Sequence, residues 1–281
     1  MDVSAALLQG QGLLEDAAIA VPRLTAEVLL AHAIGCERAW LFAHSDEPLR
    51  EVWWIHYGRY LHERMQGKPT QYITGRQEFY GREFRVTPDV LIPRPETEHV
   101  VEAALARVVK DAGSMPLSII DIGTGSGAIA VTVALETGVS VIGTDISTAA
   151  VGVASENARR LKASLHSVHF VVCDLADAIA GGRFDLVVSN PPYVPESDSS
   201  TIQREVRDHE PAVALYGGAD GFEVYRRLIP EAARLLKPGG WLVMEIGYRS
   251  GEAVASMLGT WSEVETIPDL AGLPRVIVAR R

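Results

Sequence analysis

Residues 119–127 read Ile-Ile-Asp-Ile-Gly-Thr-Gly-Ser-Gly, a short apolar stretch that runs into three glycines at alternate positions. β-Branched apolar residues favour a buried strand, and glycines allow a sharp turn in which a ligand approaches main-chain N–H groups at a helix start. An apolar, helix-like run follows from Ala128. The stretch therefore predicts a strand, a glycine loop and a helix that together bind a nucleotide-like cofactor.

Short apolar strands alternate with helix-like segments on both sides of this loop. The sequence predicts strands at 118–122, 139–143, 169–172, 184–189 and 241–246, and helices at 98–109, from about 128, at 148–161 and at 222–236. This alternation predicts an α/β fold of the Rossmann-like type, a parallel sheet covered by helices on both faces. Residues 237–240, Lys-Pro-Gly-Gly, are expected to form a turn before the last of these strands.

The first part of the chain has a different character. Its apolar residues recur at helical spacing, which predicts a small helical bundle. Aromatic and β-branched runs between residues 77 and 92 then predict a hairpin, and two prolines stop regular structure just after it. We expect a helical substrate-binding domain at 1–75, a hairpin linker at 76–95 and an α/β domain at 96–281.

Composition limits the classes of function that the chain can have. The 281 residues carry a formal net charge of −10, from 36 acidic and 26 basic side chains. The first 80 residues alone hold 10 acidic and 7 basic side chains. Since nucleic-acid binding relies on positive charge, a surface built as a whole to hold phosphates is disfavoured, and no direct nucleic-acid substrate is expected.

Cysteine usage and hydropathy point to an ordinary cytoplasmic protein. The two cysteines form no CxxC pair and have no histidine cluster beside them, so neither a disulfide framework nor a metal site is expected. No apolar run approaches the roughly 20 residues that span a bilayer. The first residues lack the features of a secretory signal or an Arg-rich transit peptide.

Three aspartates follow the predicted strands and bear on the identity of the cofactor. Asp145, at the end of the second strand, suits the ribose hydroxyls of either a dinucleotide or S-adenosylmethionine (SAM). Asp121, just ahead of the glycines, would repel a pyrophosphate but suits a cofactor that carries an ammonium and a sulfonium. Asp174, after the third strand, could accept a hydrogen bond from an adenine amine. These positions favour SAM over a nicotinamide dinucleotide, which the glycine loop alone leaves open.

Residues 184–193 read Phe-Asp-Leu-Val-Val-Ser-Asn-Pro-Pro-Tyr and predict the reacting site. Each proline pushes the residue before it into an extended conformation, so Asn190 and Pro191 should be rigid where the strand ends. The Asn190 side-chain oxygen and the Pro191 main-chain oxygen then form a pair of acceptors. Such a pair can grip and aim an –NH2 group on a planar carbon, a poor nucleophile, while Tyr193 packs on its flat face.

This motif is similar to that of methyltransferases that act on amino groups of planar systems, including adenine N6 and glutamine N5. Other segments resemble the peptide chain release factor glutamine methyltransferases, the PrmC/HemK family: residues 71–75, 79–81, 91–98, 210–212 and 217–221, with Leu215. Among them, Ile-Pro-Arg-Pro-Glu-Thr-Glu at 92–98 is much more specific than Asn-Pro-Pro-Tyr. The resemblance covers essentially the whole chain from about residue 5.

The resemblance implies a seven-stranded SAM-dependent methyltransferase domain after a helical domain that helps to bind class 1 peptide chain release factors, methylated on the glutamine of their Gly-Gly-Gln motif. We expect the cofactor to contact Asp121, Gly123, Thr124, Gly125, Ser126, Gly127, Asp145, Asp174, Leu175 and Asn190. The glutamine is expected to contact Asn190, Pro191, Pro192 and Tyr193, of which Asn190, Pro191 and Tyr193 are the predicted catalytic residues. The family often has a bulky aromatic residue where Leu175 stands, and Arg94 and Glu96 either close over the site or form a salt-bridged linker.

The residues alone leave three alternatives open. An adenine-N6 methyltransferase would use the same pair of acceptors but would need a basic surface. A ribosomal-protein glutamine methyltransferase differs only through the resemblance of the linker segments. A nicotinamide-dependent oxidoreductase depends on the glycine loop alone.

Overall fold

The computed structural model describes residues 1–110, 117–163 and 168–281. The chain divides into two compact units. One consists of Met1–Gly75 together with Gln203–His209, and the other of Arg76–Ile202 together with Glu210–Arg281. The hairpin, which the sequence analysis placed in a linker, thus groups with the second unit, and a short segment from the second half of the chain groups with the first.

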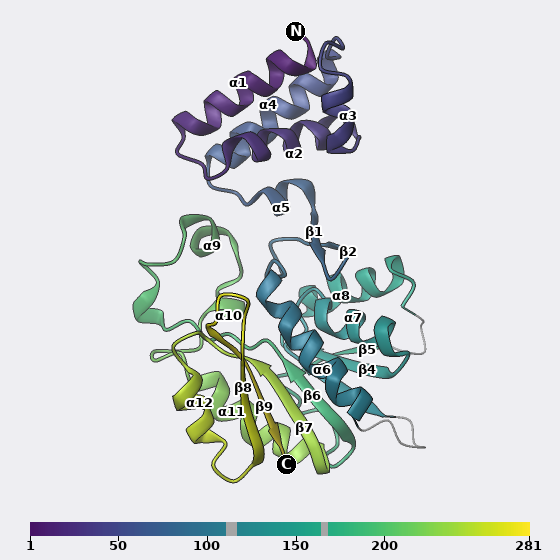
Figure 1. Cartoon of the computed structure of the whole chain (residues 1–281), viewed down its shortest axis with the longest axis vertical. Coiled ribbons are helices and arrows are strands. Elements are labelled where there is room, and N and C mark those ends of the chain that lie inside the picture. The colour runs from purple at the N-terminus through teal and green to yellow at the C-terminus, as the bar shows by residue number, and fades with distance from the viewer. Residues whose placement is uncertain (111–116, 164–167) are drawn as a thin grey trace. The chain divides into compact units, whose positions relative to one another are not determined.

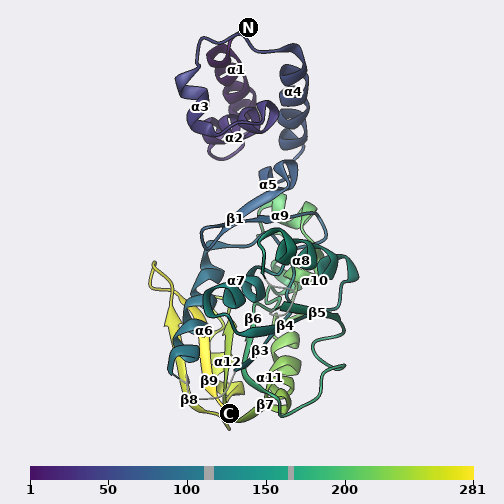
Figure 2. The ribbon, with the colours of Figure 1, turned by 90° about the vertical axis from the view of Figure 1, so that its right-hand side faces the viewer.

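The first unit is a bundle of helices (Figure 2). Its elements are α1 (Val3–Asp16), α2 (Pro22–Ile34), α3 (Arg38–Ala43), α4 (Glu51–Met65) and α5 (Thr70–Thr74), with α9 (Arg204–His209). Leu7, Leu14 and Leu29 belong to its apolar core, as the helical spacing requires, whereas Leu8 is 63% exposed. The helical region that the sequence predicts is therefore present, and helices α1, α2 and α4 turn apolar residues toward a shared core.

The short helix α9 belongs to this bundle although it is distant in sequence. Arg64, a buried residue of α4, forms an ion pair with Glu205 of α9 and donates to the Lys68 carbonyl oxygen at 3.2 Å. A Cβ added to Gly67 would lie 3.5 Å from His209 Nε2. Because Arg64 and Glu205 are about 140 positions apart in the sequence, the spacing of apolar residues did not predict this contact.

Close packing of α1 on α4 makes Gly10 sensitive to substitution. A Cβ added to Gly10 would lie 1.8 Å from the hydroxyl oxygen of Tyr57, a fully buried side chain. We expect Gly10→Ala to lower the free energy of unfolding by about 1–3 kcal/mol, because overpacking forces a large ring to move. Gly12→Ala on the same helix meets no atom within 4 Å and should instead stabilise by roughly 0.5–1 kcal/mol. Denaturant unfolding of the full chain compares the two, and equal effects would contradict this packing.

The second unit is an α/β sandwich built on a seven-stranded sheet (Figure 1). Its strands are β3 (Ser118–Ile122), β4 (Ser140–Asp145), β5 (Val168–Val172), β6 (Phe184–Ser189), β7 (Leu236–Glu245), β8 (Ser262–Pro268) and β9 (Pro274–Arg280). Its helices are η1 (Pro95–Thr97), α6 (Glu98–Lys110), α7 (Ala128–Thr137), α8 (Thr148–Arg160), η2 (Glu196–Asp198), α10 (Ala212–Leu215), α11 (Glu223–Leu235) and α12 (Gly251–Met257). The strand order is β5-β4-β3-β6-β7-β9-β8, with β9 antiparallel to both of its neighbours.

Helices cover both faces of the sheet because successive strand residues point to opposite sides. Ile119 packs in a core with α6 and α7, whereas the next residue, Ile120, packs in a second core with α11 and α12. In Figure 1, α11 and α12 lie beside the green and yellow strands of the sheet, and α7 and α8 lie beside β4 and β5. Within the described ranges, no helix has the length and apolar character needed to cross a membrane.

The hairpin is part of this unit's core. Strands β1 (Arg76–Phe79) and β2 (Arg82–Arg85) pair in antiparallel fashion. Phe79 and Phe84 meet edge to face, with ring centroids 5.9 Å apart, and both side chains are buried in the core that α6 and α7 share with the sheet. Two large buried rings anchor the segment to the α/β unit, which is why it does not behave as a free linker.

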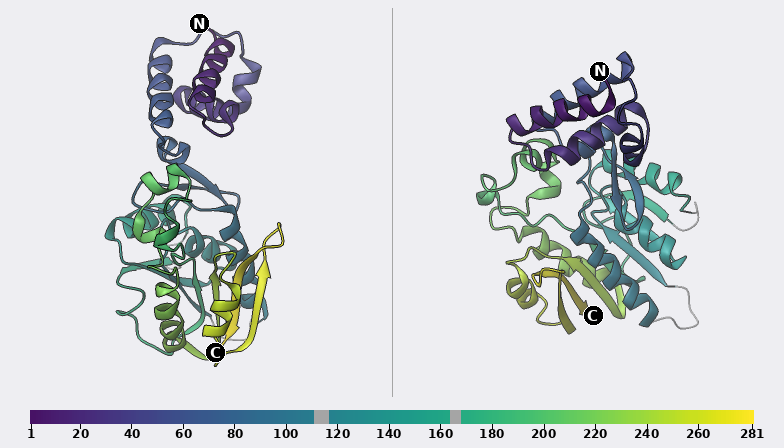
Figure 3. Two further views of the ribbon diagram at one scale, coloured as in Figure 1. Left: turned by 90° about the vertical axis from the view of Figure 1, so that its left-hand side faces the viewer. Right: turned by 45° about the horizontal axis from the view of Figure 1, so that its top comes forward.

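Two features of the sheet differ from the sequence prediction. The expected turn at 237–240 is instead an irregular part of β7, where the pairing with β6 jumps from Leu236 to Trp241. The apolar pattern predicts no strand after residue 246, yet strands β8 and β9 complete the sheet (Figure 3, left). β8 is an edge strand with almost every residue exposed, so it lacks the apolar alternation that identifies a strand.

Candidate active site

A cavity opens at the carboxyl ends of β3 and β6, the two central strands. The strand order reverses here, because β4 follows on one side and β7 on the other. This is where open α/β sheets bind their ligands. The Ser189 hydroxyl donates to the Ile122 carbonyl oxygen at 2.7 Å and ties the two strand ends together. The cavity volume is about 210 Å³, whereas one water needs only roughly 10–15 Å³, so a small organic ligand fits.

Most of the predicted site residues line this cavity. They are Gly123, Thr124, Gly125, Ser126, Asp145, Asp174, Leu175, Asn190, Pro191 and Pro192. Three predicted residues do not line it: Asp121, Gly127 and Tyr193. The fold thus brings the glycine loop and the Asn-Pro-Pro segment to one cavity, because each follows one of two neighbouring parallel strands.

The glycine loop exposes its main chain to the cavity. Gly123 and Gly125 have left-handed φ angles of 76° and 53°, and a Cβ on either would meet no atom within 4 Å. Asp145 holds the loop from the end of β4: one carboxylate oxygen accepts from Gly125 N–H at 2.8 Å and the other from Ser147 N–H at 2.9 Å. The carboxylate is therefore fixed on the cavity wall where a ribose would lie.

This placement predicts a specific effect of removing the Asp145 carboxylate. We expect Asp145→Ala to weaken binding of SAM by roughly 10- to 100-fold, since a hydrogen bond to a charged group contributes about 1.5–3 kcal/mol. Isothermal titration calorimetry measures the affinity. Asp177→Ala is the matched control, because Asp177 is exposed and does not line the cavity. Equal affinities of the two variants would remove Asp145 from the cofactor site.

Asp174 and Leu175 form the wall beyond Asp145. The Asp174 carboxylate accepts a hydrogen bond from Arg227 at 2.6 Å, which leaves its second oxygen for a ligand amine. Leu175 has a left-handed φ of 50°, and its carbonyl oxygen accepts from the Thr144 hydroxyl at 2.6 Å. A backbone held in this rarely populated region is typical of ligand sites.

Asp121 lies beneath the loop and not on its surface. The side chain is fully buried, and its Oδ2 accepts from the Thr124 hydroxyl at 2.7 Å and from Ala130 N–H at 3.2 Å. Its Oδ1 is buried and accepts no hydrogen bond in the described part of the chain. Burial raises the pKa of Asp121 to about 7, the two hydrogen bonds oppose the shift, and the nearby Asp145 adds to it. Asp121 does not line the cavity, so the structure does not support the expected direct contact between this side chain and the cofactor.

The Asn-Pro-Pro-Tyr segment divides between the cavity and the core. Asn190 lines the cavity, and its Nδ2 donates to the Thr97 hydroxyl at 3.0 Å. Tyr193 packs instead against the second core, and its hydroxyl donates to Glu245 Oε1 at 3.0 Å. Burial raises the pKa of Tyr193, and the neighbouring Glu245 carboxyl raises it further. We expected Tyr193 to pack on the substrate; the structure places it behind the segment.

A glycine-rich stretch supports this segment from outside. A Cβ on Gly217 would lie 2.7 Å from the Pro192 carbonyl oxygen, and one on Gly221 would lie 2.6 Å from that of Tyr193. Val194 N–H also donates to the Leu215 carbonyl oxygen at 3.0 Å. Close approach of two backbones therefore explains why glycines stand in the 217–221 segment that the sequence analysis noted.

The segment after the hairpin supplies a further cavity wall that the sequence analysis did not assign. It contributes Asp89, Val90, Leu91, Pro93 and Thr97. Glu210, whose side chain is 1% exposed, forms an ion pair with Arg94 and accepts from Ile92 N–H at 3.1 Å. Arg94 thus forms an ion pair with a buried carboxylate at this wall, as the salt-bridged alternative for this residue would require.

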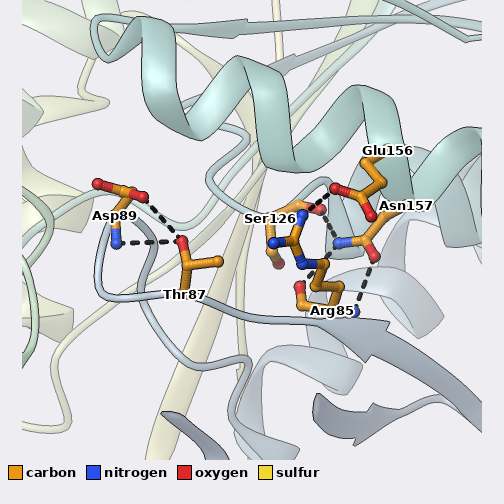
Figure 4. Close-up of polar contacts among 6 residues, drawn as sticks. All are labelled: Arg85, Thr87, Asp89, Ser126, Glu156 and Asn157. Atoms are coloured by element: carbon orange, nitrogen blue, oxygen red, sulfur yellow. Dashed lines mark hydrogen bonds and ion pairs between the residues drawn. The ribbon is translucent and has the colours of Figure 1, made fainter. Parts of the chain in front are cut away.

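Asn157 joins the end of β2 to the glycine loop (Figure 4). This fully buried residue of α8 accepts from Arg85 N–H at 2.7 Å, and its amide donates to the carbonyl oxygens of Arg85 and Ser126, both at 2.9 Å. Figure 4 also shows Thr87 bonded to Asp89 further along the same segment. Asn157 was not among the predicted site residues, because its burial inside α8 cannot be read from the sequence.

Comparison with known proteins gives the same picture. Residues 5–75 match the family described as PrmC N-terminal domain, and residues 103–210 match the Methyltransferase small domain. The release factor glutamine methyltransferase of Koribacter versatilis (strain Ellin345) is 46% identical over 270 residues, 95% of this chain and 94% of that protein. The enzyme of that name from Bacillus subtilis (strain 168) is 42% identical over 263 residues, 90% of each chain. The N-terminal domain of human METTL16 in complex with SAH shares the fold, with a TM-score of 0.51 and 18% identity over 70% of this chain and 74% of that one.

The α/β unit, its glycine loop and its Asn-Pro-Pro segment are those of a SAM-dependent methyltransferase of the Rossmann-like class. Identities of 46% and 42% extend through both units and nearly the full length of the relatives. The chain belongs to the release factor glutamine methyltransferase family.

Proposed function

We propose that this chain transfers the methyl group of SAM to the side-chain amide nitrogen, N5, of the glutamine in the Gly-Gly-Gln motif of class 1 peptide chain release factors. One observation carries the proposal: a single cavity is bounded by the glycine loop and Asp145 on one side and by Asn190, Pro191 and Pro192 on the other. A cofactor and a planar amino group can therefore meet in it. Because release factors act on the ribosome, the proposed reaction takes place in the cytoplasm.

The residues of the cavity fit SAM. The open space over Gly123 and Gly125 accepts a ligand against the main chain, and the Asp145 carboxylate is held where it can accept from ribose hydroxyls. Asp174 offers a carboxylate oxygen to the adenine amine, beside the apolar Leu175. Asp121, whose Oδ1 has no hydrogen-bond partner among the described residues, lies under the loop and supplies negative charge to the amino-acid end when its carboxyl ionises. When bound, SAM would supply an electrophilic methyl group on a sulfonium; its transfer would leave S-adenosylhomocysteine, and the methylated nitrogen would then release one proton to a neighbouring acceptor or to water.

The chain's own contribution to the reaction is orientation. An amide nitrogen is a poor nucleophile, since its lone pair is delocalised into the carbonyl group. Asn190 Oδ1 and the Pro191 carbonyl oxygen accept the two amide hydrogens, hold the nitrogen toward the methyl group and favour the positive charge that develops on it. The apolar ring of Pro192 and the wall at Val90 and Leu91 help to exclude water from this end of the cavity.

Mass spectrometry of a release factor incubated with this protein and SAM tests the proposal. We expect a gain of one methylene confined to the Gly-Gly-Gln peptide, and no gain when that glutamine is replaced by alanine. Methylation of a ribosomal protein or of adenine in a nucleic acid, with the release factor unchanged, would contradict the proposed substrate. A strong fall in partner affinity with added salt would accompany a nucleic-acid substrate.

A further inference from the structure

A buried chain of hydrogen bonds lies directly behind the Asn-Pro-Pro-Tyr segment. Glu245, at the end of β7, is 1% exposed. Its Oε2 accepts from the Thr97 hydroxyl at 2.6 Å, and its Oε1 accepts from the Tyr193 hydroxyl at 3.0 Å. The Thr97 oxygen in turn accepts from Asn190 Nδ2 at 3.0 Å. One carboxylate is thus connected to both ends of the segment.

The chemistry of these groups fixes the direction of each hydrogen bond. When Glu245 is ionised, its carboxylate only accepts, so the single hydroxyl hydrogen of Thr97 points at Glu245, as in the hydrogen bond between them. The Thr97 oxygen then has only lone pairs to offer toward Asn190. Asn190 must therefore turn its NH2 group to Thr97, which leaves its Oδ1 as the atom for a ligand in the cavity that it lines.

We propose that Thr97 and Glu245 are positioning residues that set the orientation of the Asn190 amide, so that an oxygen and not an NH2 group meets the substrate's amino group. This inference rests on the proposed function, because the orientation matters only for a substrate that donates. A flipped Asn190 would set one NH2 group against another, which removes the acceptor and leaves two donors facing each other.

The groups around Glu245 act on its ionisation in opposite directions. Burial raises the pKa of Glu245, while the hydrogen bonds from Thr97 and Tyr193 and the nearby Arg275 guanidinium oppose the shift and favour the ionised form. Arg275 is itself held by Asp269 at 3.0 Å. A hydroxyl at Thr97 is needed for this arrangement, because one oxygen must both accept from Asn190 and donate to Glu245.

The test compares Thr97→Val with Thr97→Ser in the full-length enzyme. Valine has the shape of threonine but cannot accept from Asn190 or donate to Glu245, whereas serine keeps the hydroxyl. We expect Thr97→Val to lower kcat for release factor methylation by roughly 10- to 50-fold, the equivalent of one lost charge-assisted contact, with SAM affinity by calorimetry within about threefold of wild type. Thr97→Ser should restore most of kcat.

Thr132→Val is the matched control, because it makes the same threonine-to-valine change at a buried position outside the cavity. Thr132 lies in α7, is fully buried, and its hydroxyl has no hydrogen-bond partner in the described part of the chain. Its replacement should leave kcat and SAM affinity unchanged and should not reduce stability. If the Thr97→Val protein does not fold, Thr97→Ala takes its place in the same comparison with Thr97→Ser.

The outcomes separate this inference from the proposed function. Wild-type kcat in the Thr97→Val protein, equal losses in the valine and serine variants, or a parallel loss of SAM affinity would each overturn the positioning role. A wild-type enzyme that binds SAM but leaves the release factor unmethylated would overturn the proposed function, and the inference with it, before any variant is compared.

Discussion

Replacing Asn190 by alanine is expected to lower the rate of methyl transfer by about 10²–10³-fold, the usual cost of losing one preorganised group that stabilises developing charge. Asn190 lines the cavity, and its amide is fixed by the 3.0 Å contact with Thr97. Without its oxygen, the substrate's amide group keeps a single acceptor and is no longer held in one orientation. Single-turnover methylation of a release factor, followed by mass spectrometry, measures the rate.

Binding of SAM to the Asn190→Ala protein should stay within a few-fold of wild type, because we expect most of the cofactor contacts from the glycine loop and Asp145, which line the same cavity. The control is Ser197→Ala, which removes a small polar side chain from η2 that does not line the cavity. It should leave both quantities unchanged. A loss of cofactor affinity equal to the loss of rate would instead mean that Asn190 supports the fold of the cavity.

The elements that the sequence predicted best are those whose limits are encoded locally. β3 spans Ser118–Ile122 and β6 spans Phe184–Ser189, as predicted, because an apolar run ends at glycine in one and at Asn-Pro in the other. The switch point then follows from topology, since neighbouring parallel strands carry their loops to one edge of the sheet. Most of the predicted site residues that follow these two strands accordingly line one cavity.

What the sequence did not reveal depends on contacts between distant residues. Thr97 meets Asn190 and Glu245, which lie 93 and 148 positions further along the chain. Tyr193 does not line the cavity, and its hydroxyl donates to the buried Glu245 carboxylate, 52 positions further along the chain. No period or spacing in the chain reports such a pairing, so residues that support the site from behind are found only in three dimensions.

Replacing Asp121 by asparagine is expected to change how stability depends on pH. Burial raises the pKa of Asp121 from 3.8 to about 7, so the folded protein favours the protonated carboxyl. Its stabilising contribution is complete below pH 3.8, falls as the pH rises, and is lost as the pH passes about 7. Over that range the loss is on the order of 4 kcal/mol. The variant should lack this slope.

Asparagine fits the site of the protonated carboxyl. Its oxygen can accept from the Thr124 hydroxyl and Ala130 N–H, and its NH2 group takes the place of the oxygen that has no partner. Urea unfolding of the cofactor-free proteins should give similar stabilities at pH 4 and a more stable Asp121→Asn variant at pH 8. Parallel pH profiles for the two proteins would show that Asp121 ionises as freely in the folded state as in the unfolded state.

The same substitution should also weaken cofactor binding. The ionised Asp121 carboxylate destabilises the cofactor-free protein, but it attracts the ammonium group of SAM through the loop. Binding then lowers the pKa of Asp121 and releases a proton between pH 6 and 7. Calorimetry in buffers of different ionisation enthalpy counts that proton, and Asp121→Asn should abolish its release. If the wild-type protein releases none, Asp121 only braces the glycine loop through Thr124 and Ala130, and the ammonium is bound elsewhere.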